Sequence, residues 1–256
     1  MKVNAQVVVM NKTKVDQLLE MNINNRPIKR SVVDRYKRDI VSGHWIITNQ
    51  GIGVSDSGVL IDGQHRLLAI KECGYPPVEM LIVSGLPVES QRVIDQHAKR
   101  SARDVFKFVY NASVSRVTPA VLQVIAKFEN EKIFSQASTL TIDEMFLMYE
   151  QYGSSIDEIA SQLTDITFYP APVLAASVVE HNKGGDVVRI LKFLTDIRLG
   201  EGLTRVMPEY HLRNFLSGSR ISGANSGHTM QSERYYKTKK ALIASLNGES
   251  MGVLRV

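Results

Sequence analysis

Short apolar runs separated by turn residues fill the first third of the chain, and this pattern predicts a mixed α/β region. Residues 3–10 are rich in valine and alternate weakly, which favours a strand. Two apolar runs on either side of Asp56-Ser57-Gly58 are typical of a hairpin. We expect further strands at 45–47 and 78–83, and helices at 14–21, at 32–41 after an N-cap at Ser31, and from 67 to near Gly74.

From residue 89 onward, apolar positions recur mainly at helical spacing. Residues 217–226 are rich in glycine and serine, which predicts a mobile loop. We therefore expect an α/β (α+β) domain over residues 1–112 and a mainly helical region over residues 113–256. The helices predicted after residue 88 are 89–94, 102–110, 119–131, 142–152, 155–163, 171–182, 187–199 and 231–246.

The composition limits the domain number and the cellular compartment more than it limits the function. The 256 residues fit one large domain or two modest ones, and the single cysteine, Cys73, excludes a disulfide within the chain. The apolar runs are too short for a membrane helix or a signal peptide, so we expect a cytoplasmic protein without a membrane partner. A net charge of +5 is compatible with a polyanionic partner, although many enzymes share it.

The turn Asp62-Gly63-Gln64-His65-Arg66 stands between an apolar strand and an apolar helix. A helix N-terminus offers unpaired backbone N–H groups and the positive end of the helix dipole. A glycine at this point lets a ligand approach the backbone closely. The turn therefore predicts a site for a phosphate group, although it lacks the Walker A pattern of a P-loop.

The side chains of this turn are also suited to binding a phosphate group. Arg66 can bind two phosphate oxygens, and Gln64 can orient a phosphate or a water. His65 can act as an acid or base near neutral pH. Asp62 can cap the helix, hold a metal ion through water or orient His65. The alternative is an ordinary cap and turn whose polar side chains are solvated.

Residues 59–70, Val-Leu-Ile-Asp-Gly-Gln-His-Arg-Leu-Leu-Ala-Ile, resemble the signature of the ParB/sulfiredoxin-like superfamily. The likeness is closest to its DGQHR branch, which includes DndB-type DNA-modification regulators and ParB-like proteins of phages and plasmids, and it covers about residues 22–108. In the superfamily, ParB relatives bind and hydrolyse CTP at this turn, and sulfiredoxin and free-serine kinases use ATP there. The resemblance implies that Gly63, Gln64, His65 and Arg66 bind the phosphates of ATP or CTP, with Mg²⁺ as an accompanying ion.

Other residues follow the same resemblance. Asn25-Arg26-Pro27 is similar to the ParB box beside the nucleotide, which implies that Asn25 and Arg26 contact it. Gln64 stands where sulfiredoxin has its cysteine, so we do not expect thiol chemistry. His65-Arg66 replaces the Arg-Arg pair of chromosomal ParB, and no clear ParB-type helix-turn-helix follows, which argues against a dedicated partition protein.

Residues 95–101 place one aspartate and several basic side chains in one loop, and ParB-like phage proteins have a similar segment after the motif. Lys99 and Arg100 could close over a triphosphate, and Asp95 could bind magnesium or act as a base. The alternative is a solvated basic loop capped by Ser101.

The leading hypothesis is a nucleoside-triphosphate-binding, ParB-like protein that acts on or with DNA in modification, regulation or partition. Asp62, His65 or Asp95 would then handle protons or magnesium in any NTP hydrolysis or phosphotransfer. The alternatives are an ATP-dependent kinase of a small molecule or modified base, a ParB-like nuclease, and a pure DNA-binding module; a homodimer is compatible with each. Basic clusters at residues 29–38 and at Arg220, Arg234, Lys237, Lys239 and Lys240 are candidate nucleic-acid contacts or solvated helix faces.

Overall fold

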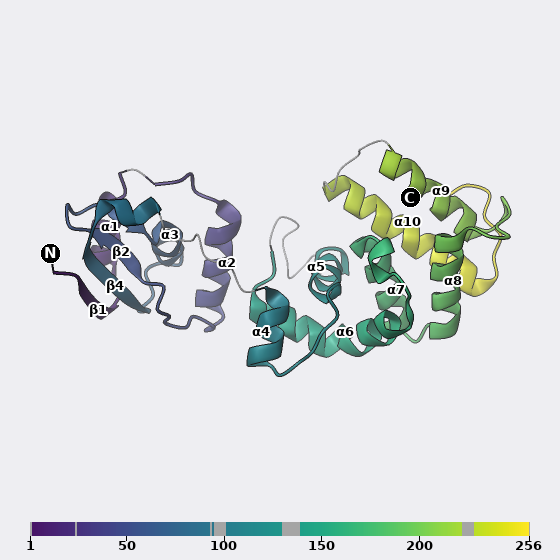
Figure 1. Cartoon of the computed structure of the whole chain (residues 1–256), viewed down its shortest axis with the longest axis horizontal. Helices are drawn as coiled ribbons and strands as arrows, with labels where there is room; N and C mark the ends of the chain where they lie inside the picture. The colour runs from purple at the N-terminus through teal and green to yellow at the C-terminus, as the bar shows by residue number, and fades with distance from the viewer. Residues whose placement is uncertain are drawn as a thin grey trace. The chain divides into compact units, whose positions relative to one another are not determined.

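The chain folds into two compact units. The computed structural model describes residues 2–23, 25–92, 94, 101–129, 139–221 and 228–255. Unit 1 comprises Met1–Lys99 with Ala137–Thr141, and unit 2 comprises Arg100–Gln136 with Ile142–Val256 (Figure 1). Unit 1 holds a mixed sheet with helices, and unit 2 is helical in its described part, which confirms the predicted α/β fold with a helical C-terminal region.

The sheet of unit 1 has the strand order β1-β4-β2-β3. Its strands are β1 (Asn4–Val9), β2 (Ile52–Ser55), β3 (Leu60–Asp62) and β4 (Glu79–Leu86). β2 and β3 form the predicted hairpin, whose turn closes with a hydrogen bond from Gly58 N to Ser55 O of 3.1 Å. β2 runs parallel to β4, so the helix between β3 and β4 is a crossover that begins at the end of the hairpin.

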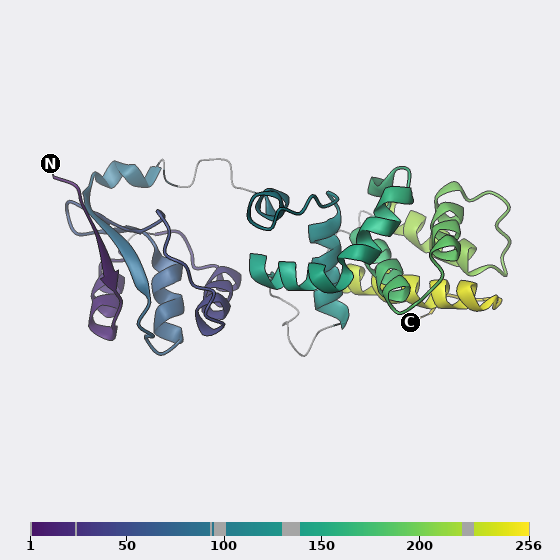
Figure 2. The same cartoon turned by 90° about the horizontal axis from the view of Figure 1, so that it is seen from below.

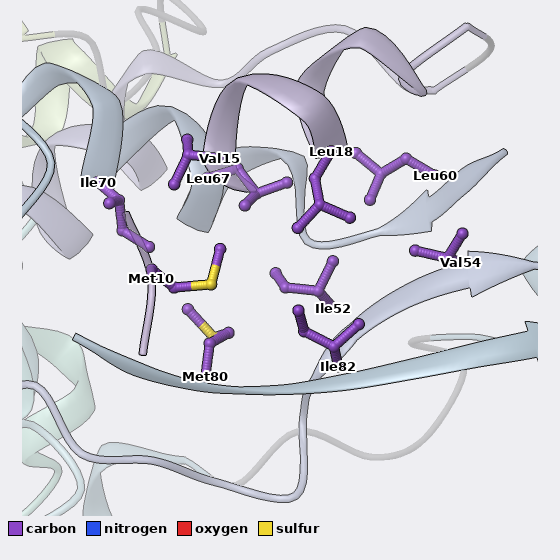
Figure 3. Close-up of a cluster of buried hydrophobic side chains, with 10 residues drawn as sticks. All are labelled: Met10, Val15, Leu18, Ile52, Val54, Leu60, Leu67, Ile70, Met80 and Ile82. Carbon is purple, nitrogen blue, oxygen red and sulfur yellow. The ribbon is translucent and has the colours of Figure 1, made fainter. Parts of the chain in front are cut away.

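Helices α1 (Lys12–Glu20) and α3 (Gln64–Glu72) lie on one side of this sheet, and α2 (Arg30–Val41) packs against α3 (Figure 2). Apolar side chains of α1 and α3 meet those of the strands in a single core (Figure 3). This core fixes α3 against β2 and therefore fixes the turn that precedes α3. Its members are Met10, Val15, Leu18, Ile52, Val54, Leu60, Leu67, Ile70, Met80 and Ile82.

Three local predictions for unit 1 were wrong. Residues 45–47 form no strand, because β4 already pairs with β1 on one edge and with β2 on the other. Trp45 instead packs against the core and donates its indole N–H to Glu79 O at 3.2 Å. The helix expected at 89–94 is the short 3₁₀ helix η1 (Val88–Arg92), and α2 begins one residue before Ser31, with Lys29 at its N-cap.

The described part of unit 2 consists of helices around a central one. Residues 172–179 of α7 are buried on every side, and α7 packs against α5, α6, α8 and α10 (Figure 1). No helix among the described residues is both long and apolar enough to span a membrane. The elements are α4 (Ala102–Val109), α5 (Thr118–Glu129), α6 (Ile142–Gln162), η2 (Ile166–Phe168), α7 (Ala171–Asn182), α8 (Val187–Leu199), α9 (Pro208–Ile221) and α10 (His228–Asn247).

Unit 2 also differs from the sequence pattern in places. α6 is continuous where two helices were predicted, and Gly153, which separated the two predicted helices, lies in its interior beside the Tyr149 ring. α9 was not predicted, and it occupies residues 217–221 of the expected loop; residues 222–227 lie outside the described part. α4 packs against α6 through Phe106 and Phe146, so it belongs to unit 2, although the predicted boundary at residue 112 grouped it with the first domain.

Candidate functional site

The turn between β3 and α3 has a conformation that glycine alone adopts easily. Gly63 is the N-cap of α3 and has φ 103° and ψ 2°, in the left-handed region. A Cβ added there would collide with Ile52 Cδ1 and lie 3.3 Å from Ile52 Cα. No side chain caps the helix, and its first backbone bond runs from Leu67 N to Gly63 O at 3.0 Å. The N–H of Gly63 itself donates to Asp62, but no side chain caps the N–H groups that follow it at the start of α3, and such groups favour an anion.

A pocket of about 180 Å³ opens at this helix end. Residues 62–65 of the turn line it together with Asn25 and Arg26, two isoleucines and Gln91 of η1. The structure thus brings the turn together with the Asn25-Arg26 pair, as the resemblance implied. Gln91 was not predicted, and nothing in its sequence context distinguishes it from a surface glutamine.

Gln64 and His65 are buried, with 4% and 6% of their surface exposed, and both side chains bond to the segment that precedes α2. Gln64 Nε2 donates to Arg26 O at 2.8 Å, and its Oε1 accepts from Asn22 Nδ2 at 3.2 Å. His65 Nε2 accepts from Lys29 N at 3.0 Å. Both residues therefore support residues 25–29, which we call segment 25–29.

The environment of His65 favours its neutral form. Because Nε2 accepts a backbone N–H, the ring proton of the neutral imidazole is on Nδ1. Burial lowers the pKa of His65 below its usual 6.5, and the charges of Arg26 and Lys29 lower the pKa further, against an opposing effect of Asp62. Acid–base chemistry by this ring in the folded state would therefore have to use Nδ1.

Arg66 is bound to the protein rather than directed into the pocket. It is 9% exposed, and its guanidinium donates to Gln50 O, to Gly51 O at 3.0 Å and to Asp62 Oδ2 at 2.9 Å. The other Asp62 oxygen accepts the backbone N–H of Gly63 at 2.6 Å. Arg66 does not line the pocket, so we assign it to holding the chain before β2 and not to a phosphate contact.

Asn25 anchors the other wall of the pocket. Its Nδ2 donates to Leu60 O at 2.7 Å and to Asn22 Oδ1 at 2.6 Å, and its Oδ1 accepts from Gln91 Nε2 at 3.1 Å. Arg26 follows directly, and it is exposed where it lines the pocket. Of the two residues implied by the resemblance, Asn25 organises the wall and Arg26 supplies the positive charge.

Three predicted site residues, Asp95, Lys99 and Arg100, lie outside the described residues. Within the described part of the chain, no three His, Cys, Asp or Glu side chains are grouped as metal ligands.

Several described members of the two basic clusters are engaged within the chain, whereas the side chain of Arg220 lies outside the described residues. On α2, Arg30 and Lys37 bond to Glu72 at 2.7 and 3.0 Å, and these bonds lower the pKa of Glu72 to about 2. On α10, Lys239 bonds to Glu129 at 2.6 Å, and Lys237 lies 3.3 Å from Glu233. Lys240 Nζ donates to Arg255 O at 2.7 Å. These contacts account for much of the basic character without a nucleic acid.

Comparisons with protein-family models, curated proteins and solved structures find no match.

Proposed function

We propose that unit 1 binds a phosphate-bearing ligand, a nucleoside triphosphate such as ATP or CTP, with its phosphates at the N-terminus of α3. One observation carries the proposal: the uncapped helix end behind the left-handed Gly63 opens on a pocket that Arg26 also lines. Backbone N–H groups at a helix start and the guanidinium of an arginine are the kinds of donor that bind phosphate.

The charges around the pocket favour the binding of a ligand with more than one negative charge. Asp62 and Arg66 pair with each other at 2.9 Å and largely cancel. Arg26 and Lys29 are two further cations beside the turn, and their fields act on His65. A helix N-terminus adds about 0.3–1 kcal/mol for each nearby anionic group. A phosphate chain matches this balance better than a single carboxylate.

The size of the pocket limits what it can recognise. Its volume of about 180 Å³ is below the roughly 300–1,000 Å³ typical of sites that enclose a whole small ligand. Phosphates fit inside, whereas the sugar and base of a nucleotide would extend beyond it. The pocket therefore supports phosphate recognition and carries no preference between ATP and CTP.

The contacts of the turn favour binding over catalysis by Asp62 and His65. Both Asp62 oxygens accept hydrogen bonds, and His65 Nε2 already accepts the N–H of Lys29. For the biological role we propose the one that the resemblance implies, namely action on or with DNA. The net charge of +5 is compatible with that partner.

The pocket volume also favours a second candidate, a binding module that holds a backbone phosphate of DNA in the same turn. A single phosphate group fits about 180 Å³ without any part left outside. This candidate predicts DNA binding that free nucleotide does not compete with at comparable concentration.

Calorimetric titration of the full chain tests the proposal. The ligands are ATP, CTP, inorganic tripolyphosphate and a DNA duplex, each with and without Mg²⁺. Arg26→Ala should weaken nucleotide and tripolyphosphate binding about ten- to hundredfold, because it removes a charge-assisted hydrogen bond. Arg35→Ala is the matched control, since Arg35 carries the same charge on α2 but lies against Tyr36 and does not line the pocket.

The outcomes separate the candidates. Nucleotide binding that Arg26→Ala weakens and Arg35→Ala does not supports the triphosphate site. DNA binding with the same variant pattern but no nucleotide binding selects the second candidate. Equal losses in both variants, or no loss in either, would contradict a site at this pocket.

A further inference from the structure

We infer that Gln64 and His65 are positioning residues, which hold segment 25–29 in the conformation that places Arg26 at the pocket. The effect of these two residues on ligand binding rests on the proposed function, whereas their restraint on segment 25–29 can be tested without any ligand.

Among the side-chain hydrogen bonds that anchor segment 25–29, three reach β3 and α3. Asn25 Nδ2 donates to Leu60 O at 2.7 Å, at the start of β3. Gln64 Nε2 donates to Arg26 O at 2.8 Å, and Lys29 N donates to His65 Nε2 at 3.0 Å. The last two bonds come from consecutive residues in the first turn of α3, so the helix end that faces the ligand also holds the cation beside it.

Apolar packing contributes little to holding this segment. Residues 26–29 are all exposed, and Ile28, the one large aliphatic side chain among them, is 48% exposed. Pro27 has no backbone N–H to offer. The buried amide and imidazole therefore restrain the backbone of this segment at Arg26 and Lys29. Lys29 is also the N-cap of α2, so His65 helps to fix where that helix begins.

The restraint from His65 depends on its protonation state. A protonated ring would present an N–H donor to the N–H of Lys29, and the hydrogen bond would be lost. The charged groups that face the ring are Arg26 and Lys29 from the segment, and Asp62 and Arg66 from the turn and α3. Burial favours the neutral ring, and three cations against one carboxylate favour it further, so the restraint is in place near neutral pH.

Amide hydrogen exchange of Lys29, measured by NMR on the full chain without ligand, tests the restraint directly. At pH 7.5 the Lys29 amide should be protected. Protection, corrected for the intrinsic rate, should fall about tenfold as His65 is protonated, since a lost hydrogen bond frees the amide. His65→Leu should remove the protection at pH 7.5, and His65→Gln should restore it without the pH dependence. Protection that is independent of pH in the wild type would overturn the inference, whatever the variants do.

Affinity for inorganic tripolyphosphate tests the consequence. His65→Leu and Gln64→Met should each weaken binding about tenfold, because Arg26 is no longer held in place. His65→Gln should recover most of the affinity, and Gln17→Met, on the exposed face of α1, serves as the control for Gln64→Met. Wild-type affinity in both His65→Leu and Gln64→Met would overturn the positioning role while leaving the proposed function intact. Failure of the wild type to bind tripolyphosphate would instead contradict the proposed function, and the Lys29 exchange data would still decide the restraint.

Discussion

At the residue scale, Gln64, His65 and Arg66 are consecutive in one helical turn, and each holds a different part of the chain. Gln64 binds Arg26, His65 binds Lys29, and Arg66 binds the carbonyls before β2. Burying three polar side chains is favourable only when their hydrogen bonds are made, and an unmet buried group costs about 1–3 kcal/mol. The polar turn therefore contributes to the fold as well as to the pocket.

Gly63→Ala should destabilise unit 1 by about 3 kcal/mol or more. A positive φ costs about 1–2 kcal/mol for a residue with a Cβ, and the added carbon would also collide with Ile52. Denaturant unfolding of the full chain measures the loss. Gly58→Ala is the control, because Gly58 has φ 77° but no atom within 4 Å of an added Cβ. Equal losses in the two variants would show that the Ile52 contact does not constrain the turn.

His65 should make unit 1 less stable in mild acid. Its folded-state pKa lies below the 6.5 of the unfolded chain, so between these two values the unfolded chain binds more protons. The free energy of unfolding is therefore fully retained above pH 6.5 and falls as the pH decreases through that window. Urea midpoints between pH 8 and 5 should fall less in His65→Gln than in the wild type. Parallel curves for the two proteins would exclude His65 as the source.

At the element scale, periodic helices were predicted well and irregular connections were not. α7 and α8 have the predicted bounds: a nearly continuous apolar run marks α7, and Gly200 ends α8 as its C-cap. Trp45–Ile47 has a strand-like composition, but β4, the strand that Trp45 contacts, is already paired with β1 and β2. Hydrophobic pattern alone does not reveal which edges are already occupied.

The sequence predicted where the candidate site lies, but not which groups its side chains contact. Local sequence identified the turn at Gly63, because polar side chains gather around a glycine between an apolar strand and an apolar helix, and such a glycine lets a ligand approach the backbone. The roles of Gln64, His65 and Arg66 depend on partners 15 to 38 residues away, such as Gly51, Lys29 and Arg26. The spacing of apolar residues along the chain does not indicate such long-range contacts. The expected phosphate contact of Arg66 could therefore not be distinguished from a structural contact.

Arg66→Met should cost about 3 kcal/mol of stability, because it leaves Asp62 and two backbone carbonyls without their shared donor. Amide exchange in β2 should become faster in the same variant. Arg30→Met is the control: it removes an arginine that also pairs with a carboxylate, but that arginine is 60% exposed, so the loss should stay within about 1 kcal/mol. Similar losses in the two variants would contradict a structural role for Arg66.

At the scale of the whole molecule, the two units have separate cores and different polar centres. In unit 2, Tyr235 is fully buried, and its hydroxyl donates to Glu129 at 2.6 Å. Burial and this carboxylate raise the pKa of Tyr235. Lys239 bonds to the same carboxylate oxygen at 2.6 Å, which joins α5 to α10. The site of unit 1 draws on none of these residues.

Calorimetric unfolding of the full chain should therefore show two transitions. Tyr235→Phe should lower one of them, since it removes a buried hydrogen bond worth about 1–2 kcal/mol, or several degrees. Tripolyphosphate should raise the other. A single transition that both perturbations move together would contradict the independence of the units.

The central claim is that phosphate binds at the start of α3, and an NMR titration of the full chain with tripolyphosphate tests it most directly. The backbone amides of Gly63, Gln64 and His65 should shift together and saturate at one common affinity, because they lie at the helix end that lines the pocket. Arg26→Ala should shift that saturation to a higher concentration. Amides of Gly63–His65 that stay unchanged while the ligand binds elsewhere, or a chain that does not bind it, would contradict the claim.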